Sequence, residues 1–494
     1  MNTIHGVLER NARKLPTKEA FITGTARLTY SDMNGKANQL ARLLIENGVR
    51  KNERMAIMSR NNEHFFYAYF ALLKAGAIPV PLNTRLKSTE VHSILERMDC
   101  RGILYEQSFQ SCVSQEAIVL PLLAVSLEHA VNQSHPFSSD NLNFSIDTNE
   151  ICEIMLTSGT TGLPKGVMLT HAQVSSVALG IAIEFHLSHN DRILSQMPLS
   201  HSAPLNCFFM GGLYCGASHV LGDFTPQNFL QRIHQEKTTF TFASPIAYLL
   251  AAKEPSLSNY DLSSMRVFAY GGGAMPLASY HFVTKAFHNK NFYQVYGLTE
   301  AGPNGSLLRP EEHEHKPGSI GKTPVVNMEM KVINDDGTET APGEYGEIIL
   351  AGDSVMSGYF NNKDATEEIL REGWIYTGDI AYRDEDGYLF IVDRKKDMII
   401  PGGVNVYPRE IEETLTKHPD VLQACVVGVQ DQEWGETIKA VIVRKEDSEV
   451  SEGELRSFLS GHLAAYKCPR TYSFVTELPY NANGKILKQL VKEM

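Results

Sequence analysis

The sequence predicts an α/β fold, and three observations support this prediction. Stretches of strand type alternate with stretches of helical periodicity in residues 29–81 and again in residues 193–292, which is typical of parallel sheets covered by helices. From Gly318 to Ile391 short strands are instead separated by Gly and Asp turns, a pattern typical of a small β barrel. The length of 494 residues exceeds what one hydrophobic core usually organises. We therefore expect a large N-terminal domain of two α/β subdomains plus a small β barrel, followed by a small C-terminal domain.

The first alternation begins with a helix at residues 29–47. Thr29 or Ser31 can cap its N-terminus, and the apolar positions 37, 40, 41 and 44 share one face. A strand, a helix and a second strand follow, at Met55–Met58, His64–Ala75 and Ile78–Pro81. Residues 128–149 are rich in Asn, Gln, Ser and Asp, and we expect them to form a surface connection.

The second alternation and the C-terminal region supply the remaining elements. Strands are expected at Ile193–Met197, Phe240–Ala243 and Val267–Ala269. After the charged residues 394–397 comes an independent α+β set: a helix from Pro408, strands at Ala424–Val429 and Ala440–Val443, and a helix at Glu452–Ala464. We therefore place a domain boundary near Lys396.

The composition excludes several classes of protein. Lys and Arg number 45 against 57 Asp and Glu, a net charge of −12, which disfavours nucleic acid as a main partner. The seven cysteines include no CxxC pair, which argues against a metal cluster and suits a reducing compartment. The first residues have no apolar signal core, and the most apolar run, 118–127, is interrupted by Pro121. We expect a cytoplasmic protein without a transmembrane segment, and the sequence leaves its oligomeric state open.

The stretch from Leu156 to Gly166 reads LTSGTTGLPKG and follows a short apolar run of strand type. Its glycines let successive backbone N–H groups face one point, its hydroxyls add donors and Lys165 adds a positive charge, so it can hold a polyphosphate. It is not a Walker loop, because Pro164 stands where the second glycine is needed and a glycine follows the lysine. From composition alone, a flexible surface loop remains the alternative.

This loop resembles the phosphate loop of the adenylate-forming superfamily, which includes acyl-CoA synthetases, peptide-synthetase adenylation domains and luciferases. The likeness extends from LTYSDM at Leu28–Met33 to NGKILK at Asn483–Lys488. It implies an N-terminal domain of residues 1–393 for ATP and the acid, a hinge at 394–396, and a mobile C-terminal domain of residues 397–494. It also implies ATP, Mg²⁺ and coenzyme A as cofactors or co-substrates. The implied phosphate contacts are Thr157, Ser158, Gly159, Thr160, Thr161, Gly162 and Lys165.

Two later segments match the family's nucleotide motifs. The resemblance implies an adenine site at Gly271, Gly272 and Gly273 in VFAYGGGAM, although a tight strand-to-helix turn is the simpler interpretation of the glycines. The segment 296–300 reads YGLTE. Tyr296 beside Gly297 offers adenine a stacking face. Thr299 can donate to the α-phosphate, and Glu300 is a carboxylate suited to Mg²⁺, where a helix cap is the alternative.

The last part of the chain carries three more residues that the resemblance assigns. Asp379 and Arg394 match ribose contacts, and Lys485 matches the catalytic lysine of the first half-reaction. An ammonium brought to the α-phosphate stabilises the charge that develops there. Without the resemblance, Lys485 would be interpreted as a solvated terminal lysine.

The segment MIIPGGVNVYP is implied to face the thiol acceptor. Gly402 and Gly403 would let a pantetheine arm pass close to the backbone. The sequence departs from the family pattern at Pro401, where serine is common, and at Val404, where glutamate is common.

The acid itself is constrained by the segment PLSH at positions 198–201, which matches a family position beside the acyl pocket. The resemblance makes His201 a pocket wall and a candidate catalytic residue, and Ser200 stands where phenylalanine is frequent. No Lys or Arg lies between Arg192 and Arg232, and a dicarboxylate would bury a second charge without a partner. We therefore expect a fatty acid or an aryl-propenoic acid of hydroxycinnamate type.

The leading hypothesis is a carboxylic acid:CoA ligase that forms acyl-AMP and pyrophosphate and then transfers the acyl group to CoA. A stand-alone adenylation enzyme that loads a carrier protein is the main alternative. A luciferase-like oxygen-dependent step and a nucleotide sensor without chemistry remain less favoured alternatives.

Overall fold

The computed structural model describes residues 3–24, 26–113, 123–142, 145–157, 164–401, 404–431, 435–480 and 486–494. The chain forms two compact units. The first contains residues 1–330 and 349–376, and the second contains residues 331–348 and 377–494.

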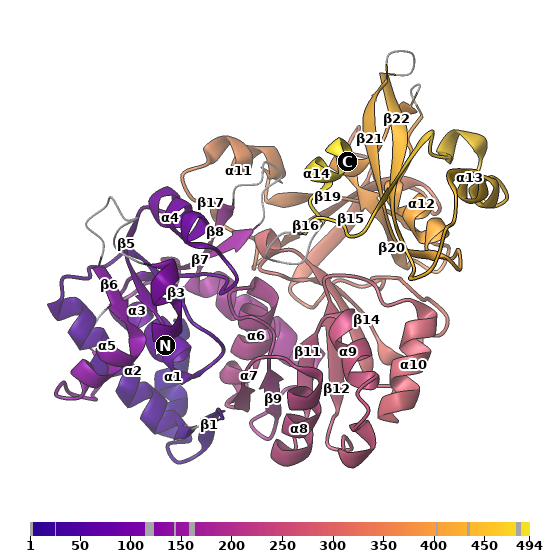
Figure 1. Cartoon of the computed structure of the whole chain (residues 1–494). Coiled ribbons are helices and arrows are strands. Elements are labelled where there is room, and N and C mark those ends of the chain that lie inside the picture. Colours follow the sequence, from indigo (N-terminus) through magenta and orange to yellow (C-terminus); the bar gives the residue numbers. More distant parts are fainter. Residues whose placement is uncertain are drawn as a thin grey trace. The chain divides into compact units, whose positions relative to one another are not determined.

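An eight-stranded sheet forms the centre of the first unit (Figure 1). Its strands, in order across the sheet, are β14 (Gly305–Leu308), β13 (Phe292–Gly297), β12 (Val267–Gly271), β11 (Phe240–Ala243), β9 (Arg192–Ser195), β10 (Ser218–Leu221), β1 (Glu19–Ile22) and β2 (Arg27–Thr29). The six inner strands are parallel, and β14 and β2 are antiparallel edge strands. The three strands predicted in this region are confirmed, one of them with its predicted bounds.

Helices connect the parallel strands, as the alternation predicts. They are α7 (Met210–Cys215), α8 (Pro226–Glu236), α9 (Pro245–Ala252) and α10 (Leu277–Phe287), while α6 (His171–Glu184) precedes β9. Figure 1 shows α9 and α10 beside β12. A π-helical segment, η3 (Ala203–Phe209), precedes α7. Its wider turn is shown by the Met210 N–H, which donates to the Leu205 carbonyl five residues back.

A second, four-stranded parallel sheet confirms the first predicted alternation. Its order is β4 (Ile78–Pro81), β3 (Arg54–Met58), β5 (Cys100–Tyr105) and β6 (Leu123–Ser126). Around it lie α1 (Ile4–Lys14), α2 (Tyr30–Glu46), α3 (Glu63–Lys74) and α4 (Ser88–Arg97). Thr29 caps α2 in a capping box with Asp32. In α3 every residue from Phe65 to Lys74 is buried, because a helix that is apolar on all sides belongs in a core.

The prediction of a surface connection at residues 128–149 is wrong at its start. Helix α5 (Leu127–Ser134) occupies that part, and Leu127 and Ala130 are fully buried. The apolar residues recur at helical spacing within the polar composition, and Ser126 caps the helix by accepting from the His129 N–H. A composition average hides such a short amphipathic helix.

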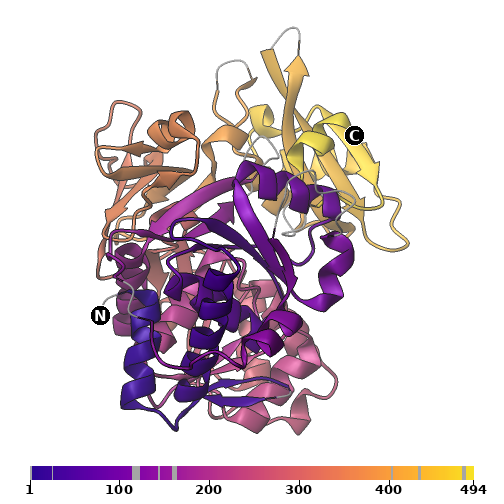
Figure 2. The same ribbon diagram turned by 90° about the vertical axis from the view of Figure 1, so that its left-hand side faces the viewer.

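Three smaller sheets complete the fold. The first has the order β17 (Gly358–Tyr359), β8 (Lys165–Thr170) and β7 (Ile151–Thr157). The second, in the region predicted as a small barrel, joins β15 (Met328–Ile333), β16 (Tyr345–Gly352), β19 (Trp374–Arg383) and β18 (Leu370–Arg371), with β20 (Leu389–Arg394) paired to β19. The third consists of β21 (Val421–Asp431), β22 (Gly435–Arg444) and β23 (Thr471–Val475), and Figure 2 shows its long antiparallel strand pair.

The remaining helices are α11 (Lys363–Ile369), α12 (Pro408–Leu415), α13 (Glu452–Ser460) and α14 (Lys488–Glu493). The helix predicted at 452–464 thus ends four residues early, beside Gly461. The two compact units divide the chain within β15, β16 and β19, so the hinge at 394–396 stays a prediction. Among the residues that the structure describes, no helix is long and apolar enough to cross a membrane.

Candidate active site

The glycine-rich segment predicted to hold adenine lies at the carboxyl end of β12. Strand β12 and its parallel neighbour β13 place Gly271 opposite Val295, so the residues after both strands leave the sheet at one edge. A Cβ at Gly271 would lie 2.8 Å from the Val295 carbonyl oxygen. Gly272, with a φ of +77°, and Gly273 face open space. The segment therefore offers bare backbone against which a flat base can lie.

The predicted magnesium ligand lies in the turn that follows β13. Tyr296 and Gly297 end this strand, and Thr299 and Glu300 begin the short 3₁₀ helix η5 (Thr299–Ala301). The Ala301 N–H donates to the Leu298 carbonyl at 2.9 Å, which keeps the turn tight. Tyr296, Thr299 and Glu300 are half-buried. The structure therefore brings these predicted residues to the same sheet edge as the glycines.

One tyrosine connects the phosphate-loop lysine to this turn. Strands β7 and β8 form a hairpin whose last residue pair is Thr157 with Lys165, and β17 pairs with β8. The Lys165 Nζ lies 4.8 Å from the ring centroid of Tyr359, and the Tyr359 hydroxyl donates to Glu300 Oε1 at 2.7 Å. Lys165 and Glu300, which are 135 positions apart in the sequence, thus contact the same buried tyrosine, one at its ring and one at its hydroxyl. Sequence reasoning missed Tyr359, because a two-residue strand gives no periodic signal.

Asn61, a second residue that the sequence did not single out, holds the PLSH segment. Its Nδ2 donates to the carbonyls of Ser195 and Met197 at 3.3 and 2.8 Å. Its Oδ1 accepts from the Leu199 N–H at 3.2 Å. The end of β3 therefore fixes the end of β9 and the turn that carries His201. His201 is half-buried, two residues before the start of η3.

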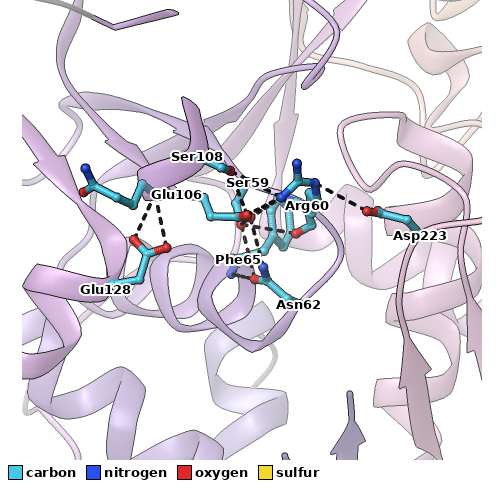
Figure 3. A network of polar contacts seen from close by, with 9 residues as sticks. Ser59, Arg60, Asn62, Phe65, Glu106, Ser108, Glu128 and Asp223 are labelled. Carbon is cyan, nitrogen blue, oxygen red and sulfur yellow. Dashed lines mark hydrogen bonds and ion pairs between the residues drawn. The ribbon is translucent and has the colours of Figure 1, made fainter. Parts of the chain in front are cut away.

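A charged network reinforces this junction between the two sheets (Figure 3). Arg60 Nη1 lies 2.7 Å from Glu106 Oε1, and its Nε lies 3.5 Å from Asp223 Oδ2. Although burial acts to raise the pKa of Glu106, the hydrogen bonds from the Arg60 N–H and Ser108 and the Arg60 charge hold that pKa below its usual value. Since both carboxylates neutralise Arg60, the network braces the carboxyl ends of β3, β5 and β10.

In the second unit, the two predicted ribose contacts are adjacent. Asp379 on β19 is paired with Arg394 on β20, and Arg394 Nε lies 2.6 Å from Asp379 Oδ1. Arg394 Nη1 also donates to the Thr377 carbonyl at 3.4 Å. The Asp379 side chain is buried, whereas that of Arg394 is 45% exposed. A sugar hydroxyl that reaches Asp379 would share this carboxylate with the guanidinium.

Comparison with known proteins identifies the family to which the chain belongs. The sequence model of the AMP-binding enzyme family matches residues 8–360, and that of the AMP-binding enzyme C-terminal domain matches residues 410–485. The chain belongs to the AMP-binding enzymes. The predicted membership of the adenylate-forming superfamily is thereby confirmed.

Named relatives of this AMP-binding enzyme cover almost its full length. It is 36% identical over 488 residues to a feruloyl-CoA synthase of Amycolatopsis, with 98% of this chain and 97% of the relative covered. It is 32% identical over 509 residues to the long-chain-fatty-acid–CoA ligase FadD13 of Mycobacterium tuberculosis, with 100% and 98% covered. The o-succinylbenzoate CoA synthetase MenE of Bacillus subtilis, solved with ATP and magnesium, matches with a TM-score of 0.89 at 30% identity, over 98% of this chain and 99% of that one. The predictions of an AMP-forming acid–thiol ligase and of ATP, Mg²⁺ and CoA are confirmed.

The residues of this AMP-binding enzyme fit a magnesium ion that is shared with substrate. Among the described residues, no group of three His, Cys, Asp or Glu side chains could hold a metal by itself. Glu300 offers carboxylate oxygen, the donor that Mg²⁺ prefers when phosphates and water supply the other ligands. The Tyr359 hydroxyl donates to Oε1 of Glu300, and a carboxylate has two oxygens, so Oε2 is the candidate ligand for the ion.

Several predicted site residues lie outside the described residues. They are Ser158, Gly159, Thr160, Thr161 and Gly162 of the phosphate loop, Gly402 and Gly403 of the thiol segment, and the lysine at 485.

A small hollow beside Tyr296 is the candidate acyl site. Its volume is about 10 Å³, room for about one water. The lining residues carry no charge, and they are Ile181, Ala203, Cys207, Phe208, Val295, Tyr296, Pro303, Asn304, Gly305, Ser306, Leu307 and Val325. The wall is formed by η3 on one side and by the segment after Glu300 on the other.

Proposed function

We propose that this AMP-binding enzyme is an ATP-dependent ligase that joins a fatty or aryl-propenoic acid to CoA. The observation that carries the proposal is the Lys165–Tyr359–Glu300 arrangement, together with an uncharged hollow whose lining residues Tyr296 and Pro303 flank Glu300 in the sequence. It supports phosphate binding on one side and an acid with an apolar tail on the other. A tail enters the hollow only when side chains such as Phe208 or Leu307 move aside.

In the first step the acid carboxylate attacks the α-phosphorus of ATP and pyrophosphate leaves. Lys165 and the Thr299 hydroxyl face the negative charge that develops on the phosphate oxygens, and Lys485 is proposed to add a second ammonium. Bound at Glu300, Mg²⁺ supplies charge neutralisation of the phosphates. Gly272 and Gly273 with Tyr296 hold adenine, and Asp379 with Arg394 holds the ribose.

In the second step the CoA thiol attacks the carbonyl of the acyl adenylate, and AMP leaves. Gly402 and Gly403 are proposed to admit the pantetheine arm. Rotation of the residues after the hinge at 394–396 is proposed to withdraw Lys485 between the two steps. His201 is proposed as a pocket wall at the reacting end of the acid. We also propose a cytoplasmic location, for which the absence of CxxC pairs is the support and cell fractionation the test.

The test is thioester formation from a panel of acids with ATP and Mg²⁺: ferulate, 4-coumarate, C8 to C16 fatty acids and malonate. Ferulate or a fatty acid should give the highest kcat/KM with free CoA. Efficient turnover of malonate would contradict the uncharged pocket. A strong preference for a pantetheinylated carrier protein over CoA would favour the carrier-loading alternative.

Replacing Lys485 tests whether this lysine acts in acyl-AMP formation and not in thioester formation. Lys485→Ala should lower acyl-AMP formation by about 10²- to 10³-fold, while thioester formation from supplied acyl-AMP stays within about threefold of wild type. Equal loss of both steps would argue against domain rotation.

A further inference from the structure

A buried carboxylate, Glu153, lies on the strand that leads into the phosphate loop. It is on β7, four residues before Thr157, and is 0% exposed. Among the described residues no Lys, Arg or His forms an ion pair with it. Burying a carboxylate without a cation costs several kcal/mol unless hydrogen-bond donors surround it. Glu153 has two such donors, which offset part of this cost.

The two donors come from two different elements. The Tyr69 hydroxyl on α3 donates to Glu153 Oε2 at 2.7 Å. Asn206 Nδ2 on η3 donates to Glu153 Oε1 at 2.6 Å and lies 3.2 Å from Ser202 Oγ. Asn206 is 0% exposed. Its Oδ1 is buried without a hydrogen-bond partner in the described part of the chain.

The neighbours of Asn206 connect this contact to the substrate sites. Cys207, the next residue, lines the hollow, and its thiol lies 3.7 Å from the Pro303 carbonyl, just after the turn that carries Glu300. Ala203, at the start of η3, lines the same hollow. The hydrogen bond between Glu153 and Asn206 therefore joins the phosphate-loop strand to the wall of the candidate acyl site.

We propose that the Glu153–Asn206 contact is a positioning contact that couples acid binding to ATP binding. A displacement of η3 by the acid tail reaches β7 by way of this hydrogen bond, and the pairing of Thr157 with Lys165 carries it to the phosphate-binding lysine. The inference rests on the proposed function, because it takes the hollow as the acid site. The proposal is supported by the free-energy cost of burying a carboxylate at this position. An apolar side chain at 153 would avoid that cost.

The unpartnered Asn206 Oδ1 gives the contact two arrangements. With Glu153 ionised, the amide donates through Nδ2, as the structure shows. With Glu153 protonated, a turned amide accepts the proton through Oδ1. The groups that face Glu153 are the Tyr69 phenol from α3, neutral Asn206 from η3 and the Cys152 thiol on its own strand. Burial raises the pKa of Glu153 to about 7, so both arrangements are populated near neutral pH.

The test measures how much an ATP analogue tightens acid binding. Titration calorimetry of the full chain would use the best acid of the panel, with and without Mg²⁺ and α,β-methylene-ATP. In the wild type the analogue should lower the Kd of the acid at least fivefold, within the usual range of coupling. This ratio of the acid Kd without the analogue to the acid Kd with it is the coupling factor. In Asn206→Leu the coupling factor should fall below twofold.

Tyr69→Phe is the matched control. It removes a hydrogen bond of similar length from the other oxygen of the same carboxylate and leaves the link to η3 in place. It should keep most of the wild-type coupling although it lowers thermal stability. If Tyr69→Phe loses as much coupling as Asn206→Leu, or if folded Asn206→Leu keeps the wild-type factor, the inference is wrong.

Glu153→Gln keeps the test decisive if Asn206→Leu does not fold. An amide at 153 cannot ionise, so the coupling factor should be the same at pH 6 and pH 8, whereas that of the wild type should differ at least twofold. A variant with the wild-type pH profile would overturn the inference. A wild type that activates acids but shows no coupling would overturn the inference alone. A wild type that exchanges no pyrophosphate with any acid would overturn the proposed function.

Discussion

Lys165 in the first unit and Lys395 in the second have opposite surroundings. Lys165 faces the ring of Tyr359, and no carboxylate forms an ion pair with it among the described residues. Lys395 lies 3.0 Å from Asp335 Oδ1 and 3.1 Å from Glu347 Oε2. The hydrogen bond to Asp335, together with the contact to Glu347, raises the pKa of Lys395 despite its partial burial.

One buried carboxylate from each unit shows the same contrast. In the second unit the buried Asp379 is paired with Arg394, whereas in the first unit Glu153 is held by the neutral donors Tyr69 and Asn206. Charges that are neutralised by each other stabilise a geometry. Charges that face rings and neutral donors remain able to respond to a phosphate or a proton. Lys165 and Glu153 are therefore the charged groups at which ligand binding should change the electrostatics most.

Replacing the two lysines should give the largest difference. Lys165→Met should lower kcat/KM for ATP by about 10²- to 10³-fold, because a charge that no carboxylate offsets is removed from the phosphates. Lys395→Met should change it by less than about fivefold and act mainly on stability. Steady-state pyrophosphate release measures kcat/KM for ATP in both variants. An equal decrease in the two variants would contradict the contrast between the two lysines.

Glu153→Gln should remove a pH dependence of stability. Since burial raises the pKa of Glu153 from 4.5 to about 7, the folded protein holds a proton in this interval that the unfolded chain has released. Stability is therefore lost as the pH rises through this window, by about 3 kcal/mol for a shift of this size. Urea unfolding at pH 5 and pH 8 should show that loss in the wild type and not in the variant. The same loss of unfolding free energy between pH 5 and pH 8 in the wild type and the variant would contradict this prediction.

Arg394→Met should reveal what pairing contributes in the second unit. It leaves Asp379 buried without its cation, and we expect a loss of about 2 kcal/mol in unfolding free energy, moderated because the arginine is half exposed. Arg394→Lys, which keeps the charge, should lose less than half as much. Thermal unfolding by circular dichroism checks this, and an unchanged midpoint for Arg394→Met would show that Asp379 needs no partner.

Tyr359→Phe should give the smallest effect. The ring that faces Lys165 stays, and only the hydrogen bond to Glu300 is lost, which corresponds to about 1 kcal/mol or about fivefold. The effect should fall on the Mg²⁺ concentration for half-maximal rate, with little change in the KM of the acid. A magnesium titration at saturating ATP measures it, and a shift in the acid KM alone would be the contrary outcome.

The strands and helices of the fold follow from local signals. The strand Phe240–Ala243 has its predicted bounds, and Thr29 is one of the two predicted caps of α2. Both are predictable because the spacing of apolar residues and the side chain of a cap involve only residues that are close in the sequence. The prediction of a surface connection is wrong at the start of residues 128–149, because α5 buries Ala130 there within a polar composition.

The candidate site was predictable only in part. The glycines after β12 and the Thr299–Glu300 pair belong to contiguous motifs, and the structure places them at one sheet edge. Tyr359, Asn61 and the Glu153–Asn206 pair belong to no motif. Their partners are distant in the sequence, and only the packing of separate elements brings them together.

The sequence by itself determined the family chemistry, because phosphate, adenine and metal contacts depend on short runs of backbone and a few fixed side chains. Only the tertiary structure decided which charges are offset and which are not. The reason is physical: the energy of a charge depends on neighbours within a few ångströms in space, and for Lys165, Glu153 and Asp379 those neighbours come from remote parts of the chain.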